Sequence, residues 1–104
     1  RIVCVFQPHT YTRTKAFLND FADALSLADV VVLADIYAAR ETDTLGISSG
    51  DIQKLIADKG TPAYHFHTFD EIENFLLKKC MNGDLLITMG AGNIVEIGEN
   101  LLNN

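Results

Sequence analysis

Positive charge is scarce in this sequence. Lysine and arginine together number 8, against 14 aspartates and glutamates, which leaves a formal net charge of −6 at pH 7. Proteins that bind nucleic acids or anionic membranes present a basic surface, because binding releases counterions from the phosphate groups. We therefore expect no nucleic-acid partner and no membrane partner, and we attribute the acidic excess to solubility.

Long apolar runs and clustered cysteines are also missing. No apolar stretch approaches the roughly 18 residues that a membrane-spanning helix requires. The only two cysteines, Cys4 and Cys80, lie far apart in the sequence, and such a pair is typical of proteins in a reducing compartment. The sequence therefore predicts a soluble cytoplasmic protein.

Glycine is absent from Gln7–Thr14, the segment that follows the first apolar run. Stand-alone modules that bind dinucleotides or flavin have a phosphate-binding loop at this point. The P-loop pattern GxxxxGK[ST] is also missing. Residues 1–104 therefore cannot hydrolyse a nucleotide by means of a P-loop. A stand-alone Rossmann-like nucleotide-binding or interaction module remains the alternative function.

What the sequence does contain is a regular alternation of strands and helices. Four mainly apolar runs predict strands at Ile2–Phe6, Val30–Ala34, Ala63–Phe66 and Asp84–Met89. These runs are continuous rather than alternating, as expected of parallel strands buried on both faces. The order predicts an α/β fold, a Rossmann-like three-layer domain with a mainly parallel sheet and four βα units.

Helical periodicity fills the intervals between the strands. Ser48 with Asp51, and Thr68 with Glu71, have the spacing of capping boxes that open the second and third helices. The first helix is expected to turn these side chains inward: Phe17, Leu18, Phe21, Ala22 and Leu25. A last helix is expected around these residues: Ile94, Ile97 and Leu101.

Two candidate binding residues follow the first strand, at the sheet edge where α/β proteins bind ligands. Arg13 falls near the start of a helix, where the macrodipole repels a cation unless the side chain meets an anion. That anion is either a ligand or a carboxylate of this chain, Asp35 or Glu41. His9, directly after Pro8, is a general base, a carboxylate contact or a turn residue.

Three further segments end at the same edge. The polar loop Asp35–Gly46 is longer than the two to six residues usual between a strand and a helix, and such length is often functional. His65 and His67 point the same way, but no cysteine or carboxylate lies at ligand spacing, so we interpret them as rim residues and predict no metal site. Gly90 and Gly92 form only a weak phosphate-loop signal, and we favour a tight turn whose backbone closely approaches a ligand or a neighbouring domain.

Three motifs occur in order along the chain: Phe6–Thr14 (FQPHTYTRT), Asp35–Glu41 (DIYAARE) and Thr88–Ile94 (TMGAGNI). Together they resemble the C-terminal domain of the Mur ligase family, and within it the ligases that add L-alanine to UDP-N-acetylmuramate. The resemblance covers nearly the whole chain. It implies that residues 1–104 are one domain of a ligase that acts in peptidoglycan synthesis.

The resemblance implies an enzyme of three domains. The N-terminal domain binds the UDP-sugar, and the central domain carries the ATP-binding P-loop and the Mg²⁺ ligands. The C-terminal domain closes over the site and contributes to amino-acid and nucleotide contacts. ATP phosphorylates the muramyl carboxylate, and the amine of L-alanine attacks the acyl phosphate. We expect ATP and Mg²⁺ to bind mainly outside residues 1–104, and we expect the isolated chain to be inactive. Because Arg1 is not methionine and leads directly into a strand, we expect a piece of a longer protein, truncated at its N-terminal side and docking on its own central domain.

The resemblance also assigns site residues. Arg13 matches a motif arginine that binds the carboxylate of L-alanine or of the product, and His9 and Tyr11 are expected beside it as substrate contacts. Thr10 stands where some members carry a second arginine. No catalytic residue is assigned. The residues expected to line the cleft are Thr10, Asp35, Tyr37, Glu41, Gly90, Gly92 and Asn93.

Overall fold

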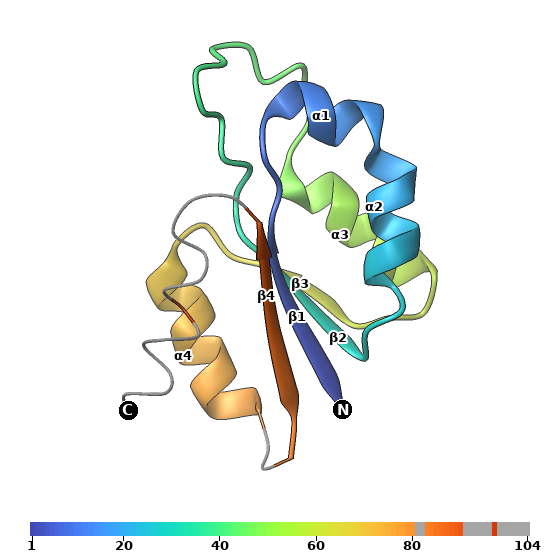
Figure 1. Cartoon of the computed structure of the whole chain (residues 1–104), viewed down its shortest axis with the longest axis vertical. Coiled ribbons are helices and arrows are strands. Elements are labelled where there is room, and N and C mark those ends of the chain that lie inside the picture. The colour runs from blue at the N-terminus through green and yellow to red at the C-terminus, as the bar shows by residue number, and fades with distance from the viewer. Residues whose placement is uncertain (81–82, 91–96, 98–104) are drawn as a thin grey trace.

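The structure is a computed structural model that describes residues 1–80, 83–90 and 97 of the chain. The described residues form a sheet of four parallel strands in the order β3-β2-β1-β4 (Figure 1). The strands are β1 (Ile2–Gln7), β2 (Val30–Leu33), β3 (Ala63–His65) and β4 (Leu85–Gly90). The predicted α/β class and parallel sheet are confirmed, and the strand order comes from the structure.

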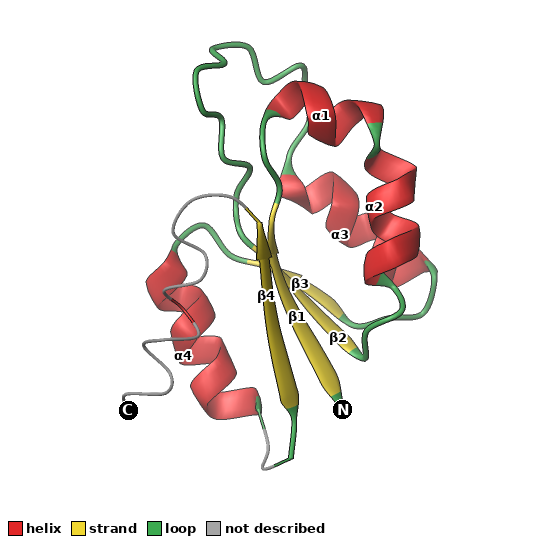
Figure 2. Cartoon of the chain, viewed as in Figure 1, coloured by secondary structure: helices red, strands yellow, loops and turns green. Residues whose placement is uncertain are grey.

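Helices cover the sheet in two groups. The helices are α1 (Tyr11–Ala16), α2 (Leu18–Leu25), α3 (Ser49–Asp58) and α4 (Phe69–Lys79). The first three lie on one side of the sheet and α4 lies on the other (Figure 2). None of the helices within the described residues is long and apolar enough to cross a membrane. The predicted last helix lies outside the described residues, apart from the buried Ile97.

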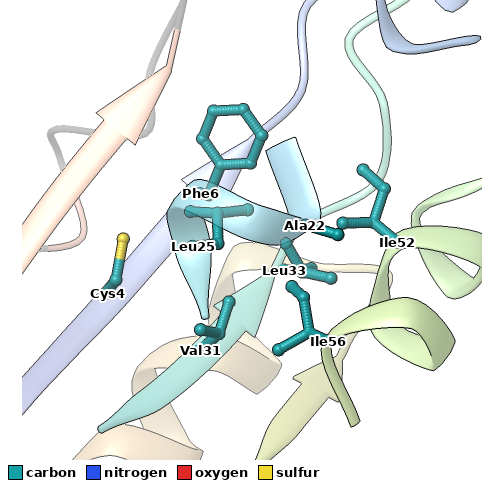
Figure 3. Packing of buried hydrophobic residues seen from close by; sticks show 8 residues of the cluster. All are labelled: Cys4, Phe6, Ala22, Leu25, Val31, Leu33, Ile52 and Ile56. Atoms are coloured by element: carbon teal, nitrogen blue, oxygen red, sulfur yellow. The ribbon is translucent and has the colours of Figure 1, made fainter. Parts of the chain in front are cut away.

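Each face of the sheet has its own hydrophobic core. Figure 3 shows the cluster between the sheet and helices α2 and α3, which consists of Cys4, Phe6, Ala22, Leu25, Val31, Leu33, Ile52 and Ile56. The cluster beneath α4 consists of Val3, Val5, Val32, Ala34, Ile72, Leu76 and Ile97. Alternate residues of β1 and β2 therefore enter opposite cores, which explains why these strands are continuously apolar.

The first predicted helix is interrupted at Phe17. The backbone of Phe17 has φ −114° and ψ 24°, and this residue separates α1 from α2. Phe17 is 50% exposed, and its ring is T-shaped to that of Phe21, with 6.4 Å between the ring centroids and 71° between the planes. The prediction that Phe17 points inward is therefore wrong, because the break rotates α1 relative to the buried face of α2.

Strand β4 is covered less completely than its apolar sequence predicts. Leu86 packs against the core beneath α4, whereas Leu85, Ile87 and Met89 on the opposite face are exposed. β4 lies at the edge of the described sheet, beside β1 only. The expectation of helices on both faces therefore holds for β1 and β2 but not for β4 within the described residues.

Candidate functional site

The carboxyl ends of the strands gather the polar segments at one edge of the sheet. After β1 the chain continues to α1 and α2 on one face, whereas Ile97, beyond β4, packs in the core on the α4 face. Connections from two adjacent strands to opposite faces define the topological switch point of an α/β sheet, where ligands bind. The Gln7–Arg13 segment therefore leaves the sheet at the position that favours a ligand site.

The loop after β1 is tied to the loop after β2. The backbone N–H of Thr10 donates to the carbonyl of Tyr37, and the N–H of Tyr37 donates to the carbonyl of Pro8, both at 2.8 Å. The rings of His9 and Tyr37 stack with 5.6 Å between centroids and 20° between planes. His9 is therefore held in one orientation, half-buried against an exposed tyrosine.

The carboxylate of Glu41 joins the tip of the second loop to the start of α1. It accepts hydrogen bonds from the backbone N–H groups of Tyr11 and Thr12 and from the hydroxyl of Thr12. An anion is favourable at this helix end, where the N–H groups have no partner within the helix. The Thr12 hydroxyl is the main cause that lowers the pKa of the Glu41 carboxyl below its ordinary value.

Arg13 lies on the exposed side of α1. Within the part of the chain that the structure describes, no carboxylate forms an ion pair with its guanidinium. Asp35 contacts His65 and His67 instead, and Glu41 is bound to the backbone of α1. The alternative in which Arg13 pairs with Asp35 or Glu41 is therefore not observed, and the guanidinium is available to an anion from outside the described residues.

Thr10 has a structural role at the start of α1. Its φ of +63° lies in a region that is unusual for a β-branched residue. Its hydroxyl accepts a hydrogen bond from the N–H of Arg13 at 3.2 Å, and its carbonyl accepts one from the hydroxyl of Thr14 at 2.6 Å. Thr10 thus caps α1 through its hydroxyl, at the point where the chain turns from the sheet edge into the helix.

Asp35 brings together two histidines that sequence spacing left without a partner. Its Oδ1 lies 2.6 Å from Nε2 of His65 and 3.1 Å from Nδ1 of His67. No carboxylate lies at ligand spacing from these histidines in the sequence, because Asp35 is 30 residues before His65. Only the pairing of β2 with β3 makes the three side chains neighbours.

A hollow of about 350 Å³ lies under the loop between β2 and α3. Its lining residues are Tyr11, Asp35, Ile36, Thr44, Ile47, Ser48 and Ser49. Tyr11 and Asp35 were predicted at the site, whereas Thr44, Ser48 and Ser49 were missed as lining residues. Ser48 was predicted only as part of a capping box with Asp51, which is confirmed. The unusual length of this loop was the sequence signal that could have identified the residues at its far end as lining residues.

Gly90 approaches the chain itself closely. Its φ is +135°, and a Cβ atom placed there would lie 2.5 Å from the carbonyl oxygen of Gln7. The close approach at this glycine was expected to be to a ligand or a neighbouring domain, whereas the structure shows one to the paired end of β1. Gly92 and Asn93, the other two predicted cleft residues of this segment, lie outside the described residues.

Removing the charge of Glu41 is expected to make folding less stable near neutral pH. Its lowered pKa means that the carboxylate stabilises the fold above the ordinary glutamate pKa of about 4.3, and that this contribution is lost as the pH falls through the lower folded value. The stability difference between the parent chain and Glu41→Gln should therefore shrink below about pH 4. Urea unfolding between pH 3 and 7 measures it.

Thr12→Val provides the matched control for this prediction. Because the Thr12 hydroxyl is the largest cause of the low pKa, Glu41→Gln in the Thr12→Val background should show a weaker pH dependence than in the parent. A stability difference that stays constant over the whole pH range would show that the carboxylate charge does not hold the helix.

Comparisons with known proteins agree on one family. The family model described as "Mur ligase, glutamate ligase domain" matches residues 1–92. A UDP-N-acetylmuramate--L-alanine ligase from Agathobacter rectalis is 72% identical over 102 residues, which are 98% of this chain and 22% of that protein. The enzyme of the same name from Caldanaerobacter subterraneus is 49% identical over the same shares of the two chains.

A solved structure supports the same relationship. The crystal structure of UDP-N-acetylmuramate-alanine ligase from Thermotoga maritima matches with a TM-score of 0.73 and 25% sequence identity. The match covers 98% of this chain and 19% of that one. This chain thus spans about a fifth of the length of the proteins that it matches.

Proposed function

Because this chain belongs to the Mur ligase family, we propose that it is the C-terminal domain of an ATP-dependent ligase that joins L-alanine to UDP-N-acetylmuramate. The chain spans 22% of the curated relatives, so the activity belongs to the longer protein. In this proposal the N-terminal and central domains bind the UDP-sugar, ATP and Mg²⁺. The reaction supplies peptidoglycan synthesis and takes place in the cytoplasm.

The described residues do not fit the primary site of ATP and Mg²⁺. The turn after β1 contains no glycine, so it offers no phosphate-binding loop. The carboxylate of Glu41 is already bound to the start of α1, and that of Asp35 contacts two imidazoles. We therefore assign the main binding of ATP and Mg²⁺ to the other domains, and the holding of the amino acid to this one.

The observation that carries this assignment is the guanidinium of Arg13, which forms no ion pair with any residue that the structure describes. It lies near the switch point of the sheet, on a helix whose start is fixed by Thr10 and Glu41. A planar guanidinium binds a carboxylate through two parallel hydrogen bonds, and a charge-assisted contact contributes about 1.5 to 3 kcal/mol. We propose that Arg13 binds the carboxylate of L-alanine or of the product, with His9 and Tyr11 beside it.

The stacked His9 and Tyr37 rings support a positioning role for this loop. Rings held in one orientation offer a rigid surface beside the proposed carboxylate site. An acyl phosphate must also be kept from water, and a domain that closes over the cleft excludes it. The contribution of these residues is therefore to orient the amine donor and to exclude solvent.

Arg13→Ala in the full-length ligase tests the proposal. Loss of 1.5 to 3 kcal/mol of binding corresponds to a rise of roughly 10- to 150-fold in the KM for L-alanine, with the KM for ATP nearly unchanged. Lys15→Ala is the matched control, because Lys15 is an exposed cation on the same helix whose Nζ lies 3.4 Å from the carbonyl of Leu45. An unchanged KM for L-alanine in Arg13→Ala, or an equal rise in Lys15→Ala, would remove the assignment.

A further inference from the structure

We propose that Asp35, His65 and His67 form a binding site for a divalent transition-metal ion, with Zn²⁺ as the best match. One ligand atom from each residue can be chosen so that all three lie within 4.8 Å of one another. Tetrahedral Zn²⁺ with bonds of about 2.0–2.1 Å holds its ligand atoms about 3.3 Å apart. The distances of 2.6 and 3.1 Å from Asp35 Oδ1 to the two histidines need only a small opening to accept an ion.

The backbone explains why these side chains meet. Leu33 of β2 pairs with His65 of β3, and the N–H of Phe66 donates to the carbonyl of Leu33 at 3.0 Å. Asp35 is two residues after Leu33, and His67 is two residues after His65, so Asp35 and His67 lie beside each other. His65 ends β3 and His67 lies two residues beyond it, and the rings of both contact the carboxylate of Asp35. The cluster thus lies at and just beyond the ends of two paired strands.

The ligand set selects the kind of ion. Two imidazoles and one carboxylate suit Zn²⁺, Co²⁺ or Ni²⁺, whereas Mg²⁺ and Ca²⁺ prefer oxygen ligands alone. The cluster is therefore chemically distinct from a site for the Mg²⁺ that accompanies ATP. Three protein ligands leave one tetrahedral position open for water or for a ligand from another domain.

The three proposed ligands differ in how far their side chains are exposed to solvent. The side chain of His65 is 14% exposed, that of Asp35 is 49% exposed and that of His67 is 77% exposed. His65 is thus the anchored ligand, and His67 completes the site from the solvent side. Because His67 is so exposed, it can be replaced with little risk to the fold.

The competing description is a hydrogen-bonded cluster without a metal. In that state the ring N–H groups of the histidines donate to the carboxylate of Asp35, and the cluster only links β2 to β3. Metal binding requires both imidazoles to present a lone pair to the ion, so the two states differ in whether the histidines take up Zn²⁺. A metal-binding measurement therefore separates them.

Equilibrium dialysis of the full-length protein against ZnCl₂ tests the proposal. The parent should bind one equivalent of Zn²⁺ more than His67→Gln does at the same free Zn²⁺, and the affinity of this site should fall at least about tenfold in the variant. His65→Gln and Asp35→Asn should lose the same equivalent. Dialysis against CoCl₂ should give a visible absorption band in the parent that His67→Gln lacks.

His9→Gln is the matched control, because His9 stacks on Tyr37 in the neighbouring loop and is not part of the cluster. It should keep the full Zn²⁺ content. Equal Zn²⁺ content in the parent and in a folded His67→Gln, judged by circular dichroism, would overturn the proposal. The ligase assignment is unaffected by this result, because it rests on the family match, and the proposed amino-acid site rests on Arg13.

Discussion

Gly90→Ala is expected to destabilise the chain by roughly 2 to 6 kcal/mol, with about 1 to 3 from the unfavourable backbone conformation and a similar amount from overpacking. The φ of Gly90 is +135°, and the new Cβ would lie 2.5 Å from the carbonyl oxygen of Gln7 and 3.1 Å from its backbone nitrogen. Both contacts are to backbone atoms in a paired strand, which cannot move aside as a side chain can. Urea unfolding followed by circular dichroism measures the loss.

Gly60→Ala separates the two causes. Gly60 also has a positive φ, +93°, but no atom lies within 4 Å of a Cβ added there. This control should lose only the conformational part, about 1 to 3 kcal/mol. Equal losses in the two variants would mean that the end of β4 is not held tightly against Gln7. Because Gln7 leads directly to His9 and Arg13, a tight contact here also fixes the base of the proposed site.

Leu33→Ala is expected to lower the free energy of unfolding by about 2 to 5 kcal/mol. Leu33 is fully buried in the core beneath α2 and α3, and it lies in β2 between two paired strands. Truncation removes apolar contacts and leaves a cavity that a central strand cannot easily fill. Denaturant unfolding with an unchanged m-value should give this loss.

Leu27→Ala is the matched control for the core. Its side chain is 86% exposed, so the same truncation should change stability by no more than about 0.5 kcal/mol. A loss below about 1 kcal/mol in Leu33→Ala would contradict the packing, because a buried leucine at this depth contributes more. Leu33 also precedes Asp35 by two residues. Leu33→Ala should therefore also weaken the proposed metal site, because the end of β2 loosens.

Much of the fold follows from local patterns that the structure confirms. The continuous apolar run of Val31 to Leu33 predicts a strand buried on both faces, because each face of the parallel sheet here has its own core. Thr68 accepts a hydrogen bond from the N–H of Glu71 at 3.1 Å and opens α4, as its spacing predicts. Each of these features depends on residues that are close together in the sequence.

Other expectations failed or were incomplete where distant segments decide the outcome. Phe17 fits the inward face of one long helix, but the helix breaks there and the ring is half exposed. The apolar sequence of β4 does not reveal that Ile87 and Met89 stay exposed at the edge of the sheet. Periodicity describes the face that a residue occupies on its own element, not what lies against that face.

The sequence by itself determined the class of fold, the edge at which the polar residues collect and the family motifs that include Arg13. Tertiary structure alone decided that Asp35 contacts His65 and His67 and that Glu41 binds the start of α1. These contacts join residues about 30 positions apart. They depend on strand order and on the path of a long loop, which no local spacing encodes, and they are what leaves the guanidinium of Arg13 without a partner among the described residues.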